Sequence, residues 1–157
     1  MPNFFMASAR RFISDTIWTD PFIEGCSPEE KLLFIYLFSN PSVNVCGLYQ
    51  LSLPTAEAQT GIERRHILNY LMKFHEAQKI VYDAGIVFLP NMAKHQRASG
   101  ILIDKHIQKI ATLHVSESNV AYSAFIRHFG SPLEAPSEPL EGYRERDRDN
   151  ERGKGNV

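Results

Sequence analysis

Residues 46–89 read CGLYQLSLPTAEAQTGIERRHILNYLMKFHEAQKIVYDAGIVFL, and this stretch determines the fold that we expect. Its apolar periodicity changes from alternation to a helical repeat and back, with turn residues at each change. The pattern predicts five elements, which in order are a strand over Leu48–Leu51, a helix over Pro54–Thr60, a helix over Glu63–Gln78, and a hairpin of Ile80–Tyr82 and Ile86–Leu89 around Asp83-Ala84-Gly85.

The turn between the two predicted helices carries the most specific local signal. Gly61 stands where a positive φ is commonly needed, and glycine adopts it without steric penalty. Ile62 is placed to fill the angle between the helices, and Ala56 is small enough to let them approach. A strand, two helices joined in this way and a hairpin are typical of a winged helix-turn-helix. We therefore expect an α+β fold, mainly α, with a small sheet and wing and additional C-terminal helices.

The longer helix is predicted to have two faces. An apolar stripe of Ile67, Tyr70, Leu71 and Phe74 would face the core, and polar side chains would occupy the opposite face. Cations and amides suit a helix that reads DNA, although a solvated helix face is usually charged as well. Thr55 at the start of the preceding helix and Lys79 at the root of the hairpin extend this polar face. The predicted DNA-binding set is therefore Thr55, Arg64, Arg65, His66, Asn69, Lys73 and Lys79.

The predicted wing argues against a strong DNA contact on its own edge. It is short, with Asp83 at its tip and only Lys79 at its root. A wing that binds phosphate usually carries Lys or Arg at the tip, because that contact is electrostatic.

The flanking segments suggest four parts to the chain. Residues 1–27 form an apolar arm expected to pack on the domain, with Trp18 as a core anchor. Residues 28–90 are the winged helix, opened by a helix start with a capping box at Ser27–Glu30. Residues 91–130 are a helical extension, and residues 131–157, rich in proline and then in mixed charge, are expected to be disordered.

The extension leaves two questions open. Its start, residues 91–100, is polar and basic, and reads either as a linker or as a second phosphate-binding patch. Helices are then predicted over Ile101–Leu113, with Ile103, Ile107 and Ile110 on one face, and over Ser118–Phe129. They either complete the core or meet another subunit.

Composition narrows the class of protein. The 157 residues carry a net charge of -1, so a DNA site must be a local patch and not a chain-wide basic field. Cys26 and Cys46 lack metal-ligand spacing, which favours buried thiols in a reducing compartment over a disulfide. No long apolar run, nucleotide-binding loop or catalytic motif is present. We expect a non-enzymatic cytoplasmic protein, without membrane contact, cofactor or metal site.

Several blocks of the chain resemble a known family. They are Ile17–Phe22, Ser27–Leu33, Leu37–Pro41, Cys46–Tyr49, Thr60–Ile62, Lys79–Asp83 and Asn91–Gln96. Together they resemble the winged-helix region of phage-type replication proteins, the replisome organisers and DnaD-like phage proteins, over about residues 10–110. Where that family commonly has a glycine at the end of the recognition helix, this chain has Gln78.

The resemblance implies a role in starting DNA replication. Such proteins bind double-stranded DNA at a phage origin and help to bring the host replicative helicase or its loader to it. Two other functions fit the same sequence. One is a transcriptional regulator of a phage operon, and the other is a scaffold in which the winged helix mediates protein contact and homo-oligomerisation.

Overall fold

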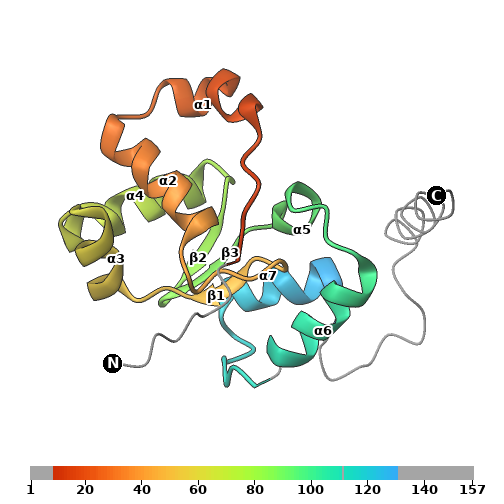
Figure 1. Cartoon of the computed structure of the whole chain (residues 1–157). Helices are drawn as coiled ribbons and strands as arrows, with labels where there is room; N and C mark the ends of the chain where they lie inside the picture. Colours follow the sequence, from red (N-terminus) through yellow and green to blue (C-terminus); the bar gives the residue numbers. More distant parts are fainter. Residues whose placement is uncertain (1–8, 111, 131–157) are drawn as a thin grey trace, which may run out of the picture.

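A computed structural model of the chain describes residues 9–110 and 112–130 (Figure 1). In this part the protein is mainly helical with one small antiparallel sheet, as the α+β prediction requires. The elements are η1 (Asp15–Thr19), α1 (Pro21–Glu24), α2 (Pro28–Ser39), β1 (Leu48–Gln50), α3 (Leu53–Thr60), α4 (Arg64–Glu76), β2 (Val81–Asp83), β3 (Ile86–Phe88), α5 (Met92–His95), α6 (Gly100–Ile110) and α7 (Val120–Phe129).

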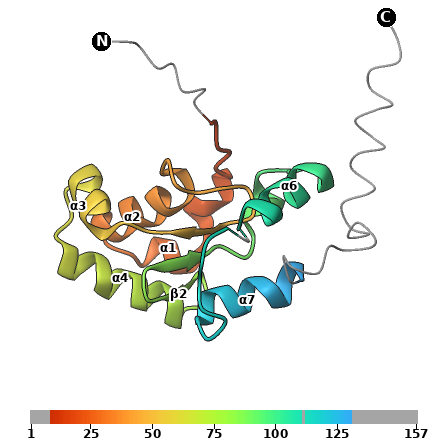
Figure 2. The same cartoon turned by 90° about the horizontal axis from the view of Figure 1, so that it is seen from below.

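The sheet separates two groups of helices. Its strand order is β1-β3-β2, and Phe88 of β3 lies opposite Leu48 of β1 and Val81 of β2. Because successive side chains of a strand point to opposite faces, Tyr49 and Val87 join a core with α1–α4, and Phe88 joins a second core with α6 and α7. Figures 1 and 2 show these two groups on opposite sides of the strands.

Helix α2 begins with the predicted capping box. The Ser27 hydroxyl accepts the Glu30 N–H at 3.2 Å, and the Glu30 carboxylate accepts the Ser27 N–H at 2.7 Å. The helix then places Leu33 and Leu37, both fully buried, in the first core.

The turn between α3 and α4 also has the predicted construction. Gly61 ends α3 with φ of 74°, and Ala56 and Ile62 are buried where the two helices meet. Of the predicted stripe on α4, Ile67, Leu71 and Phe74 are fully buried. Tyr70 is only half-buried, because its hydroxyl reaches the carboxylate of Glu29 at 2.9 Å.

Helix α4 ends in a left-handed turn at Gln78, whose φ is 57°. The Gln78 N–H donates to the His75 carbonyl and the Lys79 N–H to the Phe74 carbonyl, each at 2.9 Å. This bonding pattern is the Schellman motif, whose left-handed position is usually glycine. This chain forms the turn with Gln78, a residue that is strained in the left-handed region.

Gln78→Gly is therefore expected to stabilise the protein. Glycine relieves the left-handed penalty of roughly 1–2 kcal/mol, while its freer unfolded chain takes back part of that gain, leaving about 0.5–1 kcal/mol. Urea unfolding followed by circular dichroism measures the change. Gln78→Ala serves as the control, since alanine keeps the penalty and should show no gain. A Gly variant no more stable than the Ala variant would contradict the strained turn.

The C-terminal helices complete the core, which answers the question that the sequence left open. Helix α7 lies over the sheet, and Phe125 packs edge-on against Phe88 with ring centroids 5.7 Å apart. Ile103, Ile107 and Ile110 of α6 are buried beside it, as predicted. The sheet of this protein thus has no open face in the described residues.

The structure corrects the prediction for Trp18 and excludes one of the two alternatives for residues 91–100. Trp18 is not a core anchor, since it is 56% exposed. It lies in a 3₁₀ helix, where neighbours point about 120° apart, and there Ile17 turns inward instead. The segment 91–100 is not a free linker, because it contains α5 with Met92 and Ala93 fully buried.

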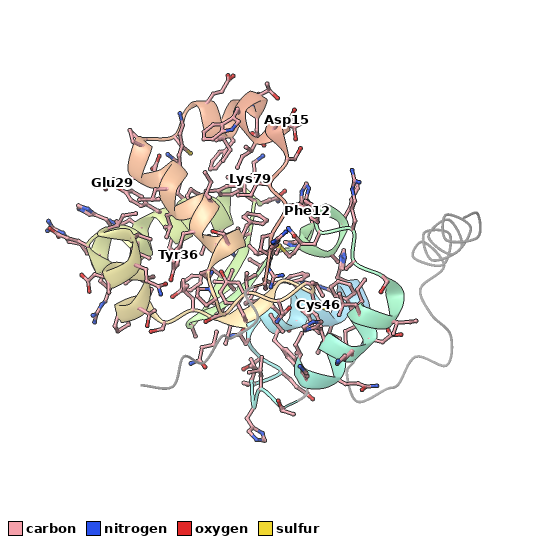
Figure 3. The ribbon with its side chains drawn as sticks, viewed as in Figure 1. Phe12, Asp15, Glu29, Tyr36, Cys46 and Lys79 are labelled. Carbon is pink, nitrogen blue, oxygen red and sulfur yellow. The ribbon has the colours of Figure 1, made fainter. Side chains whose placement is uncertain are left out.

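The cysteines are buried thiols, as predicted. Cys26 and Cys46 are both unpaired, and burial raises the pKa of Cys46 to about 12. Figure 3 shows Cys46 at the boundary between the sheet and α6, where its thiol lies 3.6 Å from the Ile103 carbonyl. Over the residues that the structure describes, no helix combines the length and apolar character needed to cross a membrane.

Candidate nucleic-acid interface

The outward face of α4 is defined by the residues most distant from its buried stripe. At 3.6 residues per turn, one arc of the helix carries Arg65, Leu68, Asn69, Met72 and Glu76, all of them exposed. Arg65 and Asn69 belong to the predicted DNA-binding set. The other members of that set lie on the flanks of the helix or on neighbouring elements.

The two arginines at the start of α4 are engaged in exposed ion pairs. Glu57 of α3 accepts both the backbone N–H and the guanidinium of Arg64, each at 3.1 Å, and so joins α3 to α4. Arg65 contacts Glu63 at 2.8 Å, and its side chain is 75% exposed. Such exposed pairs are weak because water and salt screen both charges, so a phosphate or a base edge can replace either carboxylate at little cost.

Lys73 is held more firmly than the arginines. It lies on the flank of α4 that faces α2, and its ammonium binds both carboxylate oxygens of Glu30, at 2.8 and 2.9 Å. Glu30 is only 10% exposed and is also part of the capping box of α2. Lys73 therefore stabilises the packing of α2 on α4. A contact between Lys73 and a DNA phosphate would require breaking its ion pair with Glu30.

His66 and Lys79 also face carboxylates of neighbouring elements. His66 lies 4.0 Å from Glu29 at the start of α2, a residue labelled in Figure 3. Lys79 binds Asp20 at 2.7 Å and lies 5.4 Å from the ring centre of Phe22, so it fastens the arm to the end of α4. Figure 3 shows Lys79 close to this arm and not on the outward face of α4.

Thr55 and the β2–β3 hairpin lie at the edge of the candidate interface. Thr55 is exposed in the first turn of α3, where its N–H donates to the cap residue Ser52. Asp83 of the β2–β3 hairpin accepts the N–H of Val120 at 2.8 Å, and its carbonyl accepts the side-chain amide of Asn119. This acid therefore holds the start of α7, which gives it a structural role.

The ion pair at Glu30 shifts the acidity of this carboxyl. Burial by itself would raise the pKa of Glu30, but the hydrogen bonds from Lys73 and from the Ser27 N–H outweigh it, so the pKa lies below its ordinary value of 4.5. A carboxyl whose pKa is lowered by folding stabilises the protein above its unfolded pKa, and this contribution disappears as the pH falls through the folded value.

Lys73→Met is expected to destabilise the protein most at neutral pH. Without the ammonium, burial leaves Glu30 as an unpaired charge, and protonation at low pH removes that cost. The difference in unfolding free energy between wild type and variant should shrink as the pH falls below about 4.5. Urea unfolding between pH 7 and pH 3 measures it. Arg10→Met, which removes an exposed cation of the N-terminal arm, should show a difference that does not change with pH. The same constancy for Lys73→Met would contradict the pairing.

Sequence reasoning missed two residues of this face, Leu68 and Met72. They are 36% and 45% exposed, although both are apolar. The signal was available, because Arg65, Leu68, Asn69 and Met72 follow the i, i+3, i+4, i+7 spacing of a single helix face. Lys73 was predicted on this face, but it lies on the flank of α4 beside α2.

We also compared the chain with known proteins. A scan against family models and searches of curated proteins and of solved structures found no significant match to the chain.

Proposed function

We propose that this chain is a winged helix-turn-helix protein that binds duplex DNA through the outward face of α4, without catalysis. The observation that carries the proposal is the order and packing of the central elements. Helix α4 follows α3 through the Gly61 turn, packs on α2 through its buried stripe, and leads into the β2–β3 hairpin. In winged helix-turn-helix proteins the helix at this place enters the major groove.

The chemistry of the outward face supports duplex DNA as the partner. Arg65 suits a guanine edge or a phosphate, and Asn69 suits the paired donor and acceptor of adenine. Both side chains are exposed at the first two turns of α4, and Arg64 and Thr55 flank them. These residues and His66 would contact the DNA. Lys73 and Lys79 instead bind carboxylates within the domain and stabilise its packing.

Within this class, we propose a role in the initiation of phage or prophage DNA replication. The support is the resemblance of residues 10–110 to phage replication proteins, together with the Schellman turn that the chain keeps at the position of their glycine. The host helicase or its loader is then the expected partner at the origin. A regulator of a phage operon uses the same contacts, and the genomic position of the bound sequence distinguishes the two.

The experiment is binding to random-sequence duplex DNA over a salt series, followed by selection of enriched sequences. The proposal predicts binding that weakens steeply with salt, since released counterions drive phosphate contacts, and an enriched motif. A dimer would enrich two half-sites. Negligible binding at low salt would rule out the proposed function.

A second candidate function is a protein-contact scaffold, and the arm favours it. Phe12 and Trp18 are more than half exposed, and a hollow of about 410 Å³ lies where the arm crosses α2 and the end of α4. Phe12 lines this hollow, and exposed aromatic side chains are typical of protein interfaces. The scaffold function requires self-association or binding to a replisome partner. Light scattering after size exclusion tests it, and Phe12→Ala should weaken the association.

A further inference from the structure

The outward face of α4 is unusual for a solvated helix because apolar and polar side chains alternate along it. Leu68 and Met72 lie one turn apart, with Asn69 beside them and Arg65 at the N-terminal end. Single exposed apolar residues are common on protein surfaces. Leu68 and Met72, however, lie together on the face proposed to contact DNA, so we looked for apolar groups on DNA that these two side chains could cover.

The size of this patch decides which partner fits. A stable protein interface buries roughly 800 Å² on each side, whereas the two side chains here are bordered by Arg65 and Glu76 on the same arc. In the major groove, by contrast, a single apolar side chain can cover the C5-methyl group of one thymine. Two isolated apolar side chains next to an amide therefore match base edges better than a protein surface.

We propose that Leu68 and Met72 contact thymine methyl groups while Asn69 binds an adjacent adenine, so that α4 prefers A·T base pairs. This inference rests on the proposed function. Leu68 and Met72 are separated by a rise of roughly 6 Å along the helix, or about two base-pair steps of roughly 3.4 Å. The three residues thus face neighbouring base pairs, and Arg65 faces the next base pair or its phosphate.

Glu76 limits how far the helix enters the groove. It lies on the same arc one turn beyond Met72, and its carboxylate would be repelled by the phosphates. The C-terminal turn of α4 therefore stays outside the groove, and the base contacts come from residues 65–72.

The test replaces thymine by deoxyuridine in the duplex obtained by selection. Deoxyuridine lacks the methyl group and keeps the hydrogen-bonding edge, so the wild-type protein should bind roughly three- to fivefold more weakly for each contacted methyl lost. Leu68→Ala and Met72→Ala should each bind the thymine duplex more weakly and lose the response at one position. Leu102→Ala, which shortens an exposed apolar side chain of α6, should keep the full response.

The outcomes separate this inference from the proposed function. Sequence-specific binding with equal affinity for thymine and deoxyuridine duplexes would overturn the inference and leave the proposed function standing. The inference would also be overturned if the enriched motif contained no A·T pairs. The same conclusion would follow if Leu68→Ala and Met72→Ala lost as much affinity as the wild-type protein when deoxyuridine replaces thymine. Absence of binding to any duplex would overturn both.

Discussion

The Gly47→Ala variant is expected to be less stable than the wild-type protein by about 2–5 kcal/mol. Gly47 has φ of 78°, and a Cβ there would lie 2.5 Å from the carbonyl oxygen of Leu89 and 2.9 Å from Cβ of Met92. The left-handed backbone contributes roughly 1–2 kcal/mol, and overpacking against backbone contributes roughly 1–3 kcal/mol. Gly47 also accepts the Leu89 N–H at 2.9 Å, so the strain reaches the sheet that supports α4.

Gly61→Ala separates the two causes. Its φ is 74°, close to that of Gly47, but nothing lies within 4 Å of the added Cβ. It should lose only the left-handed term of roughly 1–2 kcal/mol. Urea unfolding of both variants measures the difference, and equal losses would show that the close approach of Gly47 to Leu89 does not limit stability.

The Phe125→Ala variant is expected to lose about 3–5 kcal/mol, the range for a large aromatic side chain removed from a core. Phe125 is fully buried and contacts Phe88 of the sheet and Phe129 of its own helix. The loss should appear in one cooperative transition, because α7 and the sheet share a core.

Val120→Ala is the matched control, since Val120 is an exposed residue of the same helix. Its effect should stay within roughly 0.5 kcal/mol. If Phe125→Ala instead produced two transitions, one of them unchanged from wild type, then residues 91–130 would form a separate unit, contrary to the packing described above.

The sequence predicted the secondary structure best where a short motif specifies a cap, a turn or the buried face of a helix. The Ser27–Glu30 capping box, the Gly61 turn and the stripe of Ile67, Leu71 and Phe74 are all formed as expected. Each depends on bonds or periodicity within a few residues, so no tertiary information is needed.

Tertiary choices were not predictable in the same way. Whether Trp18 or Ile17 turns inward depends on the short 3₁₀ helix, and α5 is too short to show an apolar period. The partners of Lys73 and Lys79 lie 43 and 59 residues away in sequence, so no local pattern shows that these cations are paired.

The sequence predicted which helix carries the candidate site, but it did not predict all of the residues on its outward face. Arg65 and Asn69 lie on the outward arc as expected, while Lys73 lies on the flank beside α2. Leu68 and Met72 were not part of the predicted set, although their spacing places them opposite the buried stripe.

The most direct test of the central proposal is the affinity of α4 variants for the selected duplex. Arg65→Ala and Asn69→Ala should each weaken binding by roughly 1–3 kcal/mol, the range for a lost base contact. Lys105→Ala on α6 should leave it unchanged. Equal affinity of all four proteins for that duplex would show that α4 does not read DNA and would contradict the proposal.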